Sequence, residues 1–122
     1  MQLLKVTIPE LRQVVVEQLA YDYAVTPECE VWVSPLFGFL ITEVVLDRDG
    51  SKVLHVRYVE GVRIVSPTGI GLLTELCRLE GIGRIRVTAK SADLSRLYQR
   101  RGFRPVEDSP AALDLMKEIT NG

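Results

Sequence analysis

Hydrophobic and polar residues recur with two different periods along the chain, and these periods predict where helices and strands lie. Residues 2–6 are expected to form a short opening strand. From Thr7 to about Tyr23, apolar side chains recur every three or four positions, which predicts a helix that buries one stripe. Thr7 and Glu10 form a capping-box pattern at the start of this helix.

The period changes to two in the middle of the chain, where β-branched and aromatic residues are frequent. Three strands are predicted there, around Val31–Val33, over Phe39–Leu46 and over Lys52–Val59. Short segments with turn chemistry separate them, so we expect an antiparallel meander. In the third strand, Leu54 and Val56 should lie on one face and His55 on the other.

Proline, serine and glycine mark the boundaries of the elements in the second half. Ser66-Pro67 predicts a helix start, with serine as the N-cap, and Gly81 predicts its end. A strand is expected at residues 84–89, followed by a helix from Ser91 to Gly102. Residues 104–106 and 113–119 are expected to be closing strands, although the apolar spacing of the last segment also fits a helix face.

The order of these elements predicts the fold class. A strand, a helix, three antiparallel strands, and then alternating helices and strands indicate an α/β (α+β) protein. We expect a mixed, mostly antiparallel, twisted sheet of about six or seven strands, flanked by three helices on its two faces. The 122 residues, of which 47% are hydrophobic, fit a single domain over residues 1–122.

Composition narrows the partners expected from the sequence. Charged residues make up 25% of the chain and the formal net charge is −1, which argues against nucleic acid as a partner. No apolar run approaches the ~18 residues that span a bilayer, so we expect no membrane contact and a cytoplasmic protein. Cys29 and Cys77 lack metal-ligand spacing and are expected to be free thiols, with no metal site.

Two short motifs resemble one known family. Residues 91–103 are similar to the helix of Gcn5-related N-acetyltransferases (GNAT) that ends in Leu-Tyr-x-x-x-Gly-Phe, with Leu97-Tyr98 and Gly102-Phe103 at that spacing. Gly69-Ile70-Gly71 resembles the glycine pair of the family's acetyl-CoA loop. The resemblance implies the GNAT fold and transfer of an acetyl group from acetyl-CoA to the amine of a small molecule or a protein.

The resemblance also implies where acetyl-CoA binds. Helix N-termini attract phosphate, and glycine lets the backbone approach it. If the helix starts at Ser66, the glycines fall in its first turns, and if it starts after Gly71 they form a loop. Ser66 stands where the family usually has Gln or Arg. The residues implied in binding the cofactor are Val56 and Val59 on the strand, and Ser66, Thr68, Gly69, Ile70 and Gly71 at the helix start.

The same resemblance implies three residues in proton transfer. Tyr98 matches the tyrosine that protonates the departing CoA thiolate in the family. In the family a carboxylate, a histidine or a water relay takes the proton from the attacking amine, and His55 or Glu43, both on predicted strands, would be the candidates for this role here. The arginines at the end of the third helix would either meet the phosphates of CoA or complement the helix dipole.

A looser resemblance keeps a second function open. The short length and residues 53–61 look similar to abbreviated GNAT-like proteins encoded by bacteriophages, some of which are associated with virion assembly. The alternative function is therefore a non-catalytic GNAT-fold interaction or virion-assembly protein, found in the host cytoplasm or in the virion. Exposed strand edges leave room for a homodimer.

Overall fold

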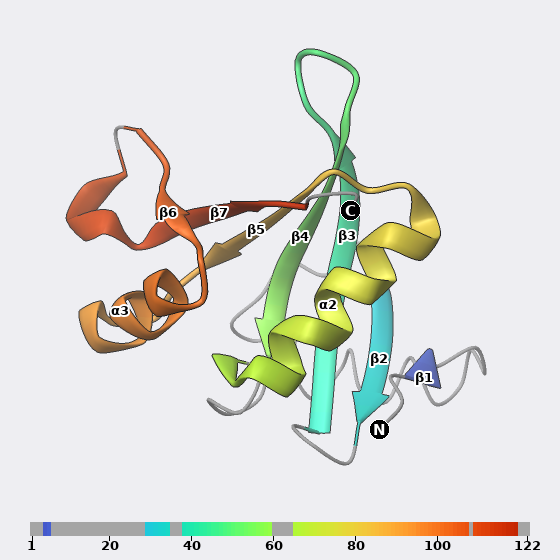
Figure 1. The fold of residues 1–122 in the computed structure, drawn as a ribbon, viewed down its shortest axis with the longest axis horizontal. Coiled ribbons are helices and arrows are strands. Elements are labelled where there is room, and N and C mark those ends of the chain that lie inside the picture. The colour runs from blue at the N-terminus through green and yellow to red at the C-terminus, as the bar shows by residue number, and fades with distance from the viewer. Residues whose placement is uncertain (1–3, 6–28, 35–37, 60–64, 108, 120–122) are drawn as a thin grey trace.

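The computed structural model describes residues 4–5, 29–34, 38–59, 65–107 and 109–119, and its centre is a mixed sheet. Seven strands follow the spatial order β1-β2-β3-β4-β5-β7-β6 (Figure 1). The pair β4–β5 is parallel and the other pairs are antiparallel, so the predicted mixed, mostly antiparallel sheet is confirmed. The elements are β1 Leu4–Lys5, β2 Glu30–Ser34, β3 Gly38–Leu46, β4 Lys52–Val59, α2 Pro67–Glu80, β5 Arg84–Thr88, α3 Ala92–Arg100, β6 Arg104–Pro105, the short 3₁₀ turn η2 Pro110–Ala112, and β7 Asp114–Glu118.

The strands β2, β3 and β4 form the predicted antiparallel meander. Their β-branched and aromatic side chains suit a pleated sheet with neighbours on both sides. The turn between β3 and β4 closes with two backbone hydrogen bonds, from the Asp47 amide to the Ser51 carbonyl and from the Gly50 amide to the Asp47 carbonyl, and Gly50 takes a positive φ of 84° there. Gly50 therefore has the conformation that the turn requires.

Helix α2 begins and ends where its capping residues predict. The Ser66 side chain accepts a hydrogen bond from the Gly69 amide at 3.1 Å, and Pro67 occupies the first helical position. At the other end, Gly81 lies in the left-handed region with φ of 68°, and its N–H bonds back to the carbonyls of the last turn. Both predicted boundaries are confirmed.

Two glycines of this helix should respond to alanine with opposite signs. Gly81→Ala is expected to destabilise the protein by about 1 kcal/mol, because alanine disfavours a positive φ. Gly71→Ala should stabilise it by up to about 1 kcal/mol, since Gly71 is exposed inside the helix and a Cβ there meets no atom within 4 Å. Urea unfolding of both variants tests this, and equal signs would contradict the assigned backbone conformations.

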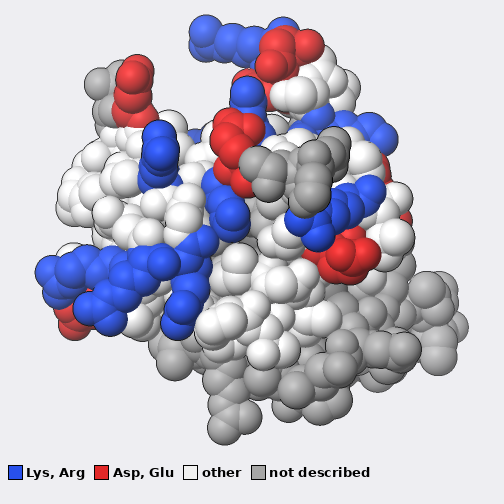
Figure 2. All heavy atoms as spheres, in the orientation of Figure 1, with Lys and Arg blue, Asp and Glu red and all other residues white. Residues whose placement is uncertain are grey.

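The two described helices cover the same face of the sheet. Leu54 pairs with Ile85, and Val87 pairs with both Val56 and Leu115, so these five side chains share one face. They belong to one buried cluster with residues of α2 and α3, among them Ile70, Leu73, Cys77 and Tyr98. Figure 2 shows that Lys and Arg side chains gather over α3. The helix predicted at residues 7–23 lies outside the described residues.

The last segment, which fitted either a strand or a helix, is the strand β7. It lies between β5 and β6 and pairs with both, and Leu115 is fully buried beneath α3.

Cys29 and Cys77 are buried free thiols, and burial raises the pKa of Cys77 to about 12. Among the described helices, none combines the length and apolar character that crossing a bilayer requires.

Candidate functional site

The strands β4 and β5 separate in the middle of the sheet. Their parallel pairing covers only four residue pairs and stops at Val56–Val87. Past that point Arg57, Tyr58 and Val59 have no described partner strand on the β5 side, whereas β5 continues beside β7. Figure 1 shows the two ribbons diverging from this point. Among the described residues, no strand pairs with this edge of β4, and backbone groups at such an edge can pair with an extended ligand.

A β-bulge lies at the start of the split. Ile41 of β3 pairs with Tyr58, but the next residue, Thr42, pairs with Val56, so Arg57 is an extra residue on β4. Bulges bend a strand, redirect a side chain and are frequent beside active sites. The bulge at Arg57 comes directly after Val56, the last residue of β4 that pairs with β5.

The N-terminus of α2 lies on the helical face of the split. Of the two alternatives for the glycine motif, the structure has the helix begin at Pro67, so Gly69 and Gly71 lie in its first turns. The Gly69 amide is capped by Ser66, and the Ile70 amide donates to the Ser66 carbonyl at 3.0 Å. The N–H of Thr68, in the same turn, has no hydrogen-bond partner among the residues that the structure describes. The first turn holds no acidic residue, so the positive end of the helix dipole is not neutralised there.

Tyr98 lies on the same face as the start of α2, on α3. Its side chain is only 2% exposed, and its ring meets Phe103 edge-on with centroids 5.1 Å apart. The hydroxyl makes no hydrogen bond to any described residue. Burial raises the pKa of Tyr98 to about 12, so the phenol keeps its proton at neutral pH. The Arg101 side chain links the end of α3 to the start of α2. Its Nε donates a hydrogen bond, at 3.0 Å, to the carbonyl of Val65, which lies just before α2.

The opposite face of the split carries charged side chains. His55 pairs with Glu43 on one side and with Arg86 on the other, one residue before the split. Glu43 accepts two hydrogen bonds from Arg57, at 2.9 and 2.6 Å. Arg86 forms an ion pair with Asp114. Both arginines beside His55 are therefore held by carboxylates.

The environment of His55 favours its neutral form. Partial burial lowers the pKa of His55 from its ordinary 6.5, and the nearby Arg57 and Arg86 lower it further. The carboxylates of Asp114 and Glu43 raise it, but their effect is smaller. His55 is thus an imidazole with a free lone pair at neutral pH, which is the form that accepts a proton.

His55 is the one histidine of the sequence, so its titration can be isolated. Because its pKa is lower in the folded protein, the unfolded chain binds the proton first as the pH falls below about 6.5. The free energy of unfolding should therefore decrease from pH 7 to pH 5, by less than about 1.4 kcal/mol per pH unit. His55→Gln should lose this part of the slope in urea unfolding. Identical slopes for both proteins would contradict the lowered pKa.

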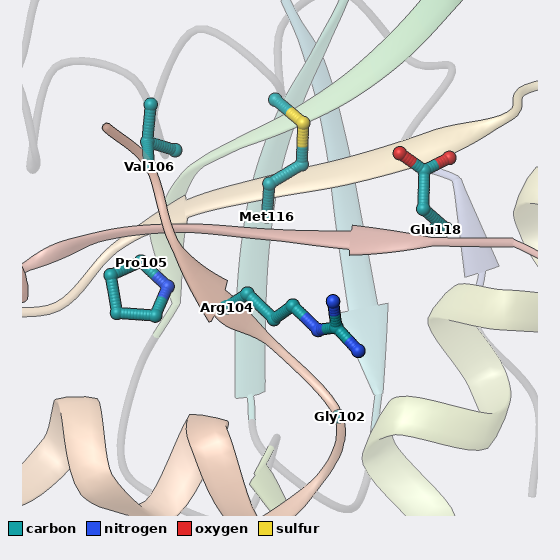
Figure 3. A pocket seen from close by; sticks show the side chains of 6 residues that line it. All are labelled: Gly102, Arg104, Pro105, Val106, Met116 and Glu118. Carbon is teal, nitrogen blue, oxygen red and sulfur yellow. The ribbon is translucent and has the colours of Figure 1, made fainter.

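A separate pocket opens at the far edge of the sheet (Figure 3). It has a volume of about 460 Å³ and lies along β6 and β7, and none of the predicted site residues lines it. Arg104 comes from β6, and Met116 and Glu118 from β7. The split between β4 and β5 is therefore the better candidate site, because it begins at Val56, next to His55, and Val56 lies in one buried cluster with Ile70 and Tyr98.

The structure places the predicted residues on two faces of the sheet. Tyr98 and the start of α2 lie on the helical face, while His55 and Glu43 lie on the opposite face, next to the point where the split begins. Val56 is the last residue of β4 that pairs with β5, and Val59, which pairs with Leu40 of β3, lies beyond that point. The sequence reasoning missed Arg57, Arg86 and Asp114. Period-two alternation places both arginines on the face of His55, but the pairing of Arg86 with Asp114 depends on the sheet order.

Known structures share this fold over almost the whole chain. An N-acetyltransferase from Staphylococcus aureus Mu50 superposes with a TM-score of 0.57 at 13% identity, over 98% of both chains. A structure of the NatC complex bound to Gag peptide and CoA gives 0.56 at 11% identity, over 98% of this chain and 100% of that one. The AtaT-AtaR complex bound to DNA gives 0.57 at 13% identity, over 98% and 95%. The fold is therefore GNAT-like. No protein-family model and no curated protein sequence matches the chain.

One expectation about partners is wrong. The net charge of −1 led us to exclude nucleic acid, but two of the similar structures, the AtaT-AtaR and KacTA complexes, contain DNA. The charge of a whole chain averages over its surface and does not describe any one region of it. Nucleic acid therefore cannot be dismissed as a partner on this ground.

Proposed function

We propose that the chain is an acyl-CoA-dependent N-acyltransferase that transfers an acetyl group from acetyl-CoA to an amine. The observation that carries this proposal is the split after Val56–Val87, which has a helix N-terminus and Tyr98 on one face and a neutral His55 on the other. The GNAT-like fold, which one CoA-bound structure also has, supports the same function.

Acetyl-CoA would bind with its diphosphate at the start of α2. The Thr68 N–H is available there, and the Ser66 hydroxyl can donate its proton to a phosphate oxygen while it accepts from Gly69. The Ser66 hydroxyl and the Thr68 amide would replace part of the hydrogen bonding to phosphate for which the family usually has a longer Gln or Arg side chain. The pantetheine arm, which contains amide groups, would run along the open edge of β4 between Val56 and Val59 and pair with its backbone.

The reaction would use groups on both faces of the split. The amine nitrogen attacks the thioester carbon, the C–N bond forms, and the C–S bond breaks as the tetrahedral intermediate collapses. His55 takes the proton that the amine loses. Glu43 is the second candidate for this role, but it would have to release Arg57 before it could accept a proton.

Tyr98 would act on the departing sulfur. A phenol with a pKa of about 12 is a weak acid. Full proton transfer from such a phenol to a thiolate of ordinary pKa, about 8.5, is uphill by roughly 5 kcal/mol. Tyr98 therefore stabilises the thiolate chiefly by donating a hydrogen bond, and the thiolate takes its proton from solvent after it leaves. The acceptor amine, of a small molecule or a protein, would approach from the face of His55.

Titration of the protein with acetyl-CoA tests the binding step. Saturating heat in calorimetry is expected, and acetyl-CoA at 100 times its Kd should stabilise the fold by about 2.7 kcal/mol. Release of the CoA thiol on addition of amines, first a polyamine and then lysine peptides, tests the transfer. No heat and no stabilisation at millimolar acetyl-CoA would overturn the proposal.

One observation favours a second function, a non-catalytic GNAT-fold interaction protein of the kind encoded by bacteriophages. Of the amides at the start of α2, those of Gly69 and Ile70 are already engaged, which leaves a small phosphate site. If this function holds, acetyl-CoA will not bind, and the chain will co-purify with a protein partner. Amine-dependent release of CoA would exclude it.

A further inference from the structure

A basic surface surrounds the C-terminal end of α3, and the proposed reaction does not use it. Residues 91–105 contain four arginines and one acidic residue, Asp93, so this segment carries a net charge of +3 in a chain whose net charge is −1. The Nζ of Lys117 lies close to this segment, 3.5 Å from the point that a Cβ would occupy if Gly102 carried a side chain. We define the basic surface by five residues: Arg96, Arg100, Arg101, Arg104 and Lys117.

The cations of this surface are less neutralised than the arginines of the sheet. Arg57, Arg84 and Arg86 each form an ion pair with a carboxylate. On the basic surface, Arg96 pairs with Asp93, and the Arg101 side chain donates to the backbone carbonyl of Val65. No ion pair to Arg100, Arg104 or Lys117 occurs among the residues that the structure describes. Arg100 and Arg104 are exposed and Lys117 is half-buried, and Figure 2 shows a group of Lys and Arg side chains over α3.

The helix dipole does not account for the whole surface. One cation in the last turn is enough to complement a helix C-terminus, and Arg100 holds that position. Arg104 lies beyond the helix on β6, where it pairs with Met116, and Lys117 lies on β7. The surface therefore spans three elements, as a binding surface for a large anion does.

We infer that the basic surface binds the phosphodiester backbone of a nucleic acid without reading its bases. Four of the five cations are arginines, whose planar guanidinium group binds phosphate through two parallel hydrogen bonds. Such contacts position a nucleic acid and carry no sequence information. The inference does not depend on acyl transfer, because the surface lies outside the split between β4 and β5.

Binding of fluorescent 20-base-pair duplex DNA, duplex RNA and single-stranded DNA to the CoA-free protein tests the inference. About four phosphate contacts on duplex DNA give a slope of about −3.6 in log K against log salt, which is a loss of affinity of about 100-fold between 50 and 200 mM salt. The double variant R100Q/R104Q should bind at least ten times more weakly at 50 mM salt and lower the slope by about 2.

A matched control separates this surface from the charge of the whole protein. R48Q/K52Q removes two exposed positive charges at the turn between β3 and β4, and it should leave binding nearly unchanged. Thermal unfolding should show that both double variants stay folded. Equal losses from the two variants, absence of binding at 50 mM salt, or binding to anionic vesicles but to no nucleic acid would each overturn the inference. Since no CoA is present, these outcomes are distinct from a failure of the proposed acyl transfer.

Discussion

Replacing Thr68 with glutamate is expected to weaken acetyl-CoA binding by about 10- to 100-fold while it stabilises the free protein. Thr68 is exposed in the first turn of α2, which lacks an acidic residue. A carboxylate there complements the helix dipole and stabilises the fold by about 0.3–1 kcal/mol. The same carboxylate repels a bound diphosphate, by up to about 4 kcal/mol for two charges 4 Å apart near a protein surface.

The opposite signs make this result diagnostic. Thermal unfolding measures the stabilisation, and calorimetric titration measures the affinity for acetyl-CoA. Thr68→Gln, which has a similar size but no charge, should change the affinity much less. If Thr68→Glu stabilises the protein and acetyl-CoA binds as tightly as before, the diphosphate lies elsewhere.

Tyr98→Phe is expected to slow acyl transfer by about 10- to 100-fold with little change in stability or in acetyl-CoA affinity. A hydrogen bond to a charged group contributes about 1.5–3 kcal/mol, and the variant removes one that forms only as the thiolate leaves. The fold should be unaffected, because the hydroxyl has no hydrogen-bond partner among the described residues and the ring contact with Phe103 remains. The rate of amine-dependent CoA release measures the effect.

Tyr98→Leu provides the comparison for packing. It removes the ring as well as the hydroxyl, so it should lower the free energy of unfolding in addition to the rate. Should Tyr98→Phe transfer acetyl groups at the wild-type rate, the tyrosine would have a packing role only, and the sulfur would be stabilised by another group.

Local chemistry made the elements of this chain and the β2–β3–β4 meander predictable, while the pairing of β7 was not. The ends of α2 follow from Ser66, Pro67 and Gly81, whose conformational preferences act within one turn. The spacing of Leu113, Met116 and Ile119 fits both a helix and a strand. Pairing of β7 with β5 and β6 decides between them, and that pairing is a tertiary contact.

The candidate site, too, was predictable where it depends on local sequence and not where it depends on strand pairing. Tyr98 and the glycine pair could be found from short motifs, because each motif is contiguous. The split could not, since it depends on where the β4–β5 pairing stops and on a one-residue offset at Arg57. The arginines at the end of α3 are visible in the sequence, whereas the approach of Lys117 to them depends on the fold.

The central claim is that the start of α2 binds the diphosphate of CoA, and the backbone amides of this turn report on it directly. In ¹H–¹⁵N spectra of the labelled protein, CoA and adenosine diphosphate should shift the amide signals of Thr68 and Gly69 in a saturable way, whereas pantetheine should leave them unmoved. If CoA saturates the protein while these two signals stay in place, or if it shifts no signal at all, the account is contradicted.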